Sequence, residues 1–78
     1  MNELTLFGTD GCHLCEDAAN LLAAEGIAFQ KTDIMDRAEW QEKFSLLIPV
    51  LYHIKSQRQL CWPFDSRQVQ DFCNYLQQ

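Results

Sequence analysis

The spacing between apolar residues changes along the chain, from two residues, as in a strand, to three or four, as in a helix. Residues 3–8 alternate weakly and predict a first strand. From Cys12 onward the spacing predicts a helix that ends near Gly26, because glycine commonly stops helices. Residues 27–33 predict a second strand. The buried face of the helix is expected to hold Leu14, Ala18, Leu21 and Leu22.

A second, shorter helix is predicted after this unit. Residues 36–39, Asp-Arg-Ala-Glu, fit a capping box in which aspartate takes the place of serine or threonine. The helix that begins there carries Trp40 and Phe44 on one face. Glu39 and Lys43 are four residues apart in the favourable order, so we expect them to pair.

The remainder of the chain predicts a hairpin and a final helix. Residues 48–54 predict a strand with proline near its start, residues 55–58 a polar turn, and residues 59–62 a returning strand. Asp65, with Gln68 three residues later, is expected to cap the last helix. The buried face of that helix is expected to hold Val69, Phe72, Cys73 and Leu76.

The predicted order is strand, helix, strand, helix, strand, strand, helix. The first three elements form a parallel βαβ unit with a right-handed crossover, and the next two strands form a hairpin. The prediction is an α/β fold with a mixed four-stranded sheet. We expect a single domain over residues 1–78, because 78 residues suit one small core.

Charge and hydropathy narrow the classes of partner. The formal net charge is −5, and the six basic residues are scattered rather than arranged in a stripe that could follow phosphates. Nucleic acid and anionic membrane surfaces are therefore not expected as partners. No apolar stretch approaches the length of a membrane span, and no basic leader precedes the first strand. The expectation is a cytoplasmic monomer.

Four cysteines in a reducing compartment indicate redox-active, metal-bound or free thiols rather than structural disulfides. Cys12 and Cys15 follow the first predicted strand and begin the first predicted helix, a context typical of thiol–disulfide chemistry. Free N–H groups and the helix dipole favour a thiolate there. We expect Cys12 to be the nucleophile and Cys15 the resolving thiol. Cys61 and Cys73 are interpreted as buried free thiols.

Three features spread over nearly the whole chain resemble glutaredoxins, which are small proteins of the thioredoxin fold. Cys12-His13-Leu14-Cys15 stands where that family has its Cys-x-x-Cys motif. Ile48-Pro49-Val50 resembles the family's Val-Pro signature, whose proline is cis and lies beside the active site. The hairpin followed by Asp65 and a closing helix matches the family's end. The run Trp62-Pro63-Phe64-Asp65 is similar to one in a group of short bacterial glutaredoxin-like proteins.

The resemblance implies a thioredoxin-like, glutaredoxin-type three-layer fold and a thiol–disulfide oxidoreductase that acts on protein disulfides or glutathione mixed disulfides. No bound cofactor is expected; glutathione or a thioredoxin-type reductase is the expected electron donor. Disulfide-containing proteins or small thiols are the expected partners. With Pro49 cis, the backbone of Ile48 is free to pair with an extended substrate. The substrate-binding residues that the resemblance implies are Gly11, His13, Ile48, Pro49, Trp62 and Asp65.

The chain also departs from the glutaredoxin pattern. His13-Leu14 replaces the usual Pro-Tyr, Thr9 replaces a lysine, and Trp62-Pro63-Phe64 replaces the glycine pair that receives glutathione. The presence of a glutathione site is therefore open. Acidic neighbours oppose the effect of the helix end, so we expect a less acidic Cys12 thiol than in typical glutaredoxins. These neighbours are Asp10, Glu16 and Asp17.

Two other classes of function stay open. Cys12, His13 and Cys15 could contribute to a metal or iron–sulfur site, but only with ligands from another chain or external thiols. No metal site within the chain is predicted. A redox-inert binding module with the same fold is the other class. His13 either donates a hydrogen bond to the Cys12 thiolate or is an exposed residue that tunes the potential. Trp62 either forms a wall for substrate or packs in the core.

Overall fold

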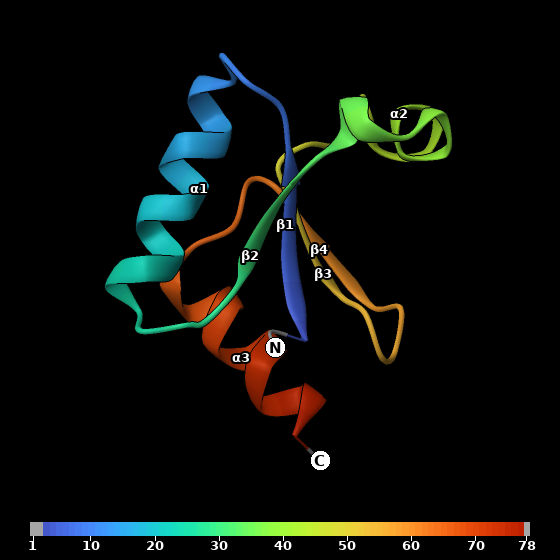
Figure 1. The fold of residues 1–78 in the computed structure, drawn as a ribbon. Helices are drawn as coiled ribbons and strands as arrows, with labels where there is room; N and C mark the ends of the chain where they lie inside the picture. The colour runs from blue at the N-terminus through green and yellow to red at the C-terminus, as the bar shows by residue number, and fades with distance from the viewer. Residues whose placement is uncertain (1–2, 78) are drawn as a thin grey trace.

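A mixed four-stranded sheet forms the centre of the molecule in the computed structural model, which describes residues 3–77. The strands lie in the order β2-β1-β3-β4. β1 runs parallel to β2 and antiparallel to β3, and β3 and β4 form the hairpin (Figure 1). The bounds are β1 Leu4–Gly8, β2 Gln30–Asp33, β3 Val50–His53 and β4 Gln59–Cys61. The predicted fold class and the predicted order of elements are confirmed.

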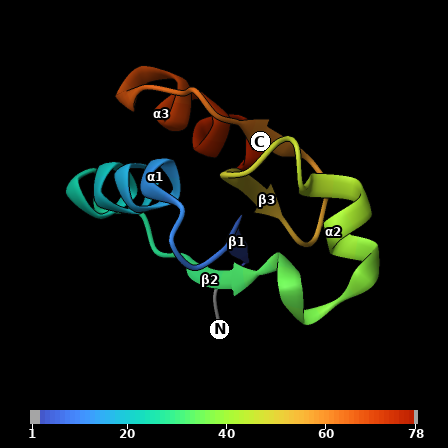
Figure 2. The ribbon, with the colours of Figure 1, turned by 90° about the horizontal axis from the view of Figure 1, so that it is seen from above.

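The helices cover both faces of the sheet, which makes three layers (Figure 2). The long helices α1 (His13–Ala24) and α3 (Ser66–Leu76) pack on one face. The short 3-10 helix η1 (Ile34–Asp36) and α2 (Ala38–Phe44) pack on the other. None of the helices among residues 3–77 has the length and hydropathy needed to cross a membrane.

Alternation along β1 and β3 supplies both cores. Leu6 pairs with Leu51 and faces α1 and α3, whereas Phe7 pairs with Val50 and faces α2. The first core also takes Ala18, Ala19 and Leu22 from α1, together with Phe64 and Val69. In the second core, the Phe44 ring stacks on Phe7 with centroids 4.4 Å apart. The structure therefore confirms that Trp40 and Phe44 share a face, and it places Phe64 in the first core.

The predicted cap of the second helix is wrong. Asp36 lies within η1 and does not cap α2; instead Arg37, whose backbone is extended, precedes α2 without a side-chain cap. Asp33 takes the capping role one element earlier, where its carboxylate accepts the N–H of Met35 at 2.9 Å. The chain forms the 3-10 helix η1 before α2 begins, so the aspartate that acts as a cap in this segment, Asp33, caps η1 and not α2.

The expected pair between Glu39 and Lys43 is also replaced by other contacts. Glu39 accepts a hydrogen bond from Arg37 at 3.1 Å. The ammonium of Lys43 lies over the rings of Phe44 and Tyr52, 5.3 and 5.7 Å from their centroids. Aromatic faces attract cations, so the two rings take the place of Glu39 as the partner of Lys43.

The start of β2 and the exposure of Leu14 differ from expectation. β2 begins at Gln30 rather than at residue 27, because Ile27 and Phe29 pack against the α1 side of the core before the pairing with β1 begins. Leu14 is 48% exposed, although it shares a helical face with Ala18. It lies in the first turn of α1, where its side chain reaches the surface. The predicted capping box of α3 is confirmed.

Candidate redox site

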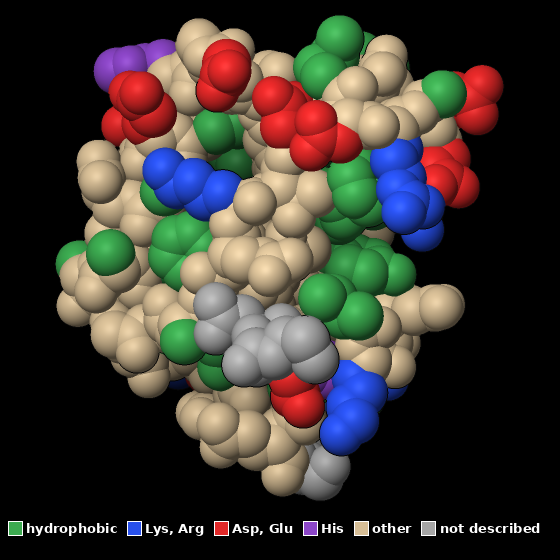
Figure 3. Space-filling model, in the orientation of Figure 1, with side chains coloured by type: hydrophobic (Ala, Val, Ile, Leu, Met, Phe, Trp, Pro, Cys, Tyr) green, Lys and Arg blue, Asp and Glu red, His purple; other side chains and the backbone are tan. Residues whose placement is uncertain are grey.

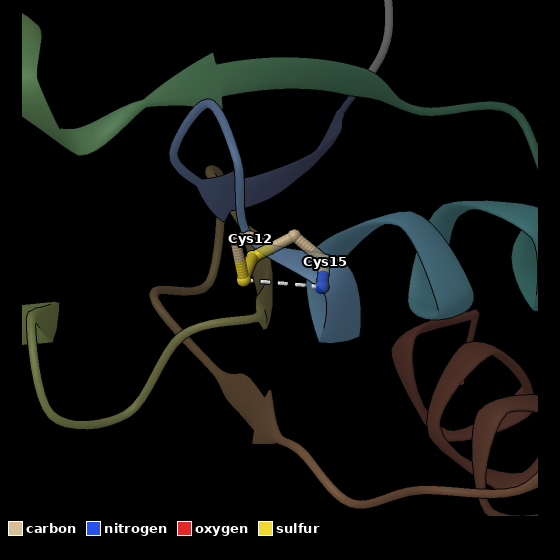
Figure 4. The surroundings of a disulfide bond; sticks show 2 residues. All are labelled: Cys12 and Cys15. Carbon is tan, nitrogen blue, oxygen red and sulfur yellow. Dashed lines mark hydrogen bonds between the residues drawn. A yellow bond between two sulfur atoms is a disulfide. The ribbon is translucent and has the colours of Figure 1, made fainter.

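Cys12 and Cys15 form a disulfide across the first turn of α1, with Cα atoms 5.2 Å apart (Figure 4). Cys12 is the N-cap of this helix, and its Sγ accepts the backbone N–H of Cys15 at 3.2 Å. Cys12 N–H donates in turn to the carbonyl of Thr9 at 3.3 Å. Both cysteines are half-buried. One sulfur thus combines two roles, because it closes the disulfide and accepts a free amide at the helix end.

Gly8, the last residue of β1, allows α1 to approach the sheet at this point. A Cβ atom at Gly8 would lie 2.9 Å from Cys15 Sγ and 3.2 Å from its Cβ. These separations are shorter than the 3.5–4.0 Å or so of an ordinary contact between carbon atoms. The absence of a side chain therefore lets Cys15 lie directly on the end of the strand. Gly11, with φ +78°, then makes the turn that leads into Cys12.

The register brings three strand ends together beneath the disulfide. Gly8 pairs with Asp33 at the end of β2. On its other side, Phe7 pairs with Val50, so Pro49 comes next to Gly8. The Ile48-Pro49 peptide bond is cis. Cys15 therefore lies over a row in which Asp33 is on one side and Pro49 on the other.

A pocket of about 160 Å³ opens beside the disulfide, between the start of α1 and the end of β2. Both sulfur-bearing residues contribute to its wall. Its charged wall residues are Asp10, Glu16, Asp33 and Lys31, so carboxylates predominate. Figure 3 shows acidic side chains gathered along the edge of the molecule where α1 begins and β2 ends.

His13, one of the residues implied by resemblance, has an exposed side chain whose contact is with Asp17. Its side chain is 85% exposed, and its Nε2 lies 3.9 Å from an Asp17 carboxylate oxygen, one turn along α1. In this oxidised structure its charged partner is therefore Asp17 rather than Cys12. Leu14, between the two cysteines, also reaches the surface.

The residues implied around the proline do lie next to one another. The backbone N–H of Trp62 donates to the carbonyl of Pro49 at 3.0 Å. The Trp62 ring meets Phe64 edge to face, with centroids 5.0 Å apart, and packs against the first core while it stays half-buried. Ile48 is half-buried and Pro49 is buried. Trp62 is thus both a core residue and an accessible one.

Asp65 has a structural partner at the start of α3. Its carboxylate accepts the N–H of Gln68 at 2.9 Å, and the Gln68 side chain accepts the N–H of Asp65 at 3.0 Å. This reciprocal pair occupies part of the carboxylate that the resemblance assigns to substrate. Any role in substrate binding must use its remaining acceptor positions.

The two other cysteines are free thiols, but they are half-buried rather than buried. Cys61 lies on β4 beside Val50, and Cys73 lies on α3 against the first core. Burial raises the pKa of the Cys73 thiol. Among residues 3–77, no group of three or more His, Cys, Asp and Glu side chains is arranged to hold a metal ion.

Sequence reasoning missed Gly8, Lys31 and Asp33 as residues of this site. Lys31 and Asp33 belong to β2, about twenty residues from the motif, and only the parallel register with β1 brings them to the pocket. The βαβ prediction contained a usable signal, because parallel strands of one unit end at the same edge. Gly8 carried no signal beyond its position just before the turn.

Comparison with known proteins identifies the family. A glutaredoxin-like domain family (DUF836) matches residues 3–74. The crystal structure of the structural-genomics target protein XcR50 from X. campestris is 36% identical, with a TM-score of 0.84 over 92% of this chain and 96% of that one. Its solution structure is 35% identical, with a TM-score of 0.82 over 95% of both chains.

A more distant structure shares the fold. The solution structure of Ne2328 from Nitrosomonas europaea is 24% identical, with a TM-score of 0.71 over 92% of this chain and 98% of that one. A search among curated proteins found no match. The family match over nearly the whole chain agrees with the disulfide at the start of α1, and both fit a redox role. The protein belongs to the glutaredoxin-like domain family.

Proposed function

We propose that the protein is a thiol–disulfide oxidoreductase in which Cys12 attacks and Cys15 resolves. The observation that carries this proposal is the N–H of Cys15, which donates to Cys12 Sγ at the start of α1. In the reduced protein, that donor and the positive end of the helix dipole stabilise negative charge on Cys12 rather than on Cys15. Cys12 is therefore the better nucleophile of the pair.

The reaction takes two exchange steps. The Cys12 thiolate attacks one sulfur of a substrate disulfide and forms a mixed disulfide with it, and the other substrate sulfur leaves as a thiolate. The Cys15 thiolate then attacks Cys12 Sγ and releases the second substrate sulfur. Two electrons have moved to the substrate, and Cys12–Cys15 is oxidised. Glutathione or a thioredoxin-type reductase is the proposed donor that restores the dithiol.

The proposed substrate contact lies at Ile48, beside the cis peptide bond. The Ile48 N–H already donates to the Phe44 carbonyl at 3.0 Å. Its carbonyl receives no hydrogen bond within residues 3–77, so it is the group left to accept an N–H from an extended substrate. Gly11, Pro49, Trp62 and Asp65 complete the proposed surface, and a cytoplasmic monomer is the proposed form.

A trapping experiment tests the assignment of roles. Cys15→Ser should accumulate a mixed disulfide with a disulfide peptide, visible as a mass increase equal to one peptide chain, because no resolving thiol remains. Cys12→Ser, the matched control, should form none at the same pH. A mixed disulfide on Cys15 in the Cys12→Ser variant, formed as fast, contradicts the assignment.

A redox titration separates this function from the metal-binding alternative. The metal-free pair should show one two-electron couple between roughly −120 and −280 mV, the range of known exchange catalysts. A pair that never oxidises contradicts the proposal. Zinc or iron that co-purifies in stoichiometric amount and depends on Cys12 supports the alternative, in which a second chain or external thiols complete a metal or cluster site.

A further inference from the structure

Negative charge predominates at the pocket that opens onto the disulfide. Asp10, Glu16 and Asp33 contribute three carboxylates to its wall, and Lys31 contributes one ammonium group. None of the three carboxylates takes part in an ion pair within residues 3–77. The charge is therefore available to whatever enters between α1 and β2.

Apolar side chains are exposed at the same end of the molecule. Leu14, which separates the two cysteines, is 48% exposed, and Leu46, which shortly precedes the cis bond, is 97% exposed. Figure 2, viewed from above, shows the segment that connects α2 to β3 crossing this end of the molecule. Apolar groups outside an acidic pocket suit a polypeptide, which can offer both a cation and apolar side chains, better than a small hydrated thiol.

Glutathione is a poor match for this surface. It carries net negative charge at neutral pH, and carboxylates that line a cleft repel an anion and slow its association. The attraction of the α1 N-terminus for anions is opposed by Glu16 in the first turn of that helix. The Trp62 and Phe64 rings pack together at the position after β4, where the glutaredoxins that this chain resembles have a pair of glycines.

We propose that the substrate is a polypeptide disulfide flanked by lysine or arginine, whose cationic side chain enters the pocket between α1 and β2. This inference rests on the proposed function and adds its substrate class. Asp10 and Glu16 determine the specificity, because they line the pocket together with Cys12 and Cys15. Their negative charge raises the encounter rate with a cationic substrate and lowers it with an anionic one.

The test uses three cyclic disulfide peptides that differ only in the residues beside their cysteines, which are lysine, serine or glutamate. Reduced protein is mixed with peptide in a single turnover. The Cys12–Cys15 dithiol gives two electrons and two protons to the peptide disulfide, so no other reductant is required. The lysine peptide should react at least about tenfold faster than the glutamate peptide at low salt. The ratio should fall as salt is raised to about 0.5 M, because salt screens exposed charges.

A pair of double variants assigns the effect to the pocket. Asp10→Asn with Glu16→Gln should bring the lysine-to-glutamate ratio to within about twofold of unity. Glu42→Gln with Asp71→Asn makes the same change in net charge away from the pocket and should leave most of the ratio in place. Equal ratios in the two double variants overturn the pocket assignment, because net charge then explains the preference.

The neutral serine peptide distinguishes a failure of this inference from a failure of the proposed function. Turnover of all three peptides at similar rates by the unmodified protein overturns the inference and leaves the oxidoreductase proposal intact. No reaction with any peptide overturns both. A faster reaction with glutathione disulfide than with the lysine peptide also overturns the inference, because it shows that the site prefers an anion.

Discussion

Adding one methyl group to Gly8 tests the packing of the redox site directly. Gly8→Ala places a Cβ atom 2.9 Å from Cys15 Sγ and 3.2 Å from Cys15 Cβ. Both atoms belong to the first turn of α1, which the disulfide holds to Cys12. The sulfur therefore has little freedom to rotate away, and the helix end or the strand must move.

The expected loss follows from two opposing effects. Overpacking of this kind costs about 1–3 kcal/mol. The backbone of Gly8 does not have a positive φ, so alanine fits the strand and recovers about 0.4–1 kcal/mol from the unfolded state. With the middle of each range, the net loss in the free energy of unfolding of the oxidised protein should be about 1.3 kcal/mol. For a domain of this size, each kcal/mol lowers Tm by about 4–8 °C.

Urea unfolding of four proteins isolates the contact. Gly8→Ala is compared with the unmodified protein, and Gly8→Ala/Cys15→Ala with Cys15→Ala. Removing the sulfur atom takes away the shorter of the two contacts, so the second comparison should show a loss at least about 1 kcal/mol smaller than the first. Losses that agree within about 0.5 kcal/mol would refute the reasoning, because additive effects mean that Gly8 and Cys15 do not interact.

Three further predictions concern the scaffold. Asp65→Ala should lower the free energy of unfolding by about 0.5–2 kcal/mol through loss of the α3 cap, whereas Asp71→Ala, within the same helix, should change it by less than about 0.5 kcal/mol in urea titrations. Phe44→Ala should lower it by about 3–5 kcal/mol, and the exposed Leu46→Ala should have almost no effect in thermal melts; similar losses for the two contradict the aromatic core. Because burial raises the pKa of Cys73 above its ordinary value of 9.0, the unfolded chain releases that proton first, and stability should fall as pH rises through 9. Cys73→Ala should flatten this fall between about pH 8 and pH 10, and an unchanged slope would contradict the raised pKa of the Cys73 thiol.

The fold could be predicted because local signals agreed with tertiary packing. The spacing of Ala18 and Leu22 identified α1, and the Asp65–Gln68 pair identified the start of α3, since both depend on residues only three or four apart. The start of α2 was missed because Asp33 and Asp36 offer competing caps to neighbouring turns. Which one is used depends on where β2 ends, and pairing with β1 decides that.

In the candidate site too, residues that depend on one segment could be predicted, and residues brought together by tertiary structure could not. Cys12 and Cys15 were found because their spacing and their position at a helix start are properties of one segment. Lys31 and Asp33 enter the pocket only through strand register, and Gly8 only through the separation of two elements in space. His13 illustrates the converse, since this residue lies inside the motif but its side chain is exposed and pairs with Asp17.

The N–H of Cys15 makes α1 sensitive to what happens at Cys12. The same sulfur that accepts this amide must bond to substrate in the proposed reaction, so the amide experiences each chemical state of Cys12 in turn. Its NMR chemical shift and its hydrogen-exchange rate should differ among the disulfide, the thiolate and the alkylated thiol. Alkylation should also speed exchange in the first turn, because a bulky thioether is a weaker cap than a thiolate. One backbone amide thus serves as a native reporter of the state of the dithiol, without any label attached to the protein.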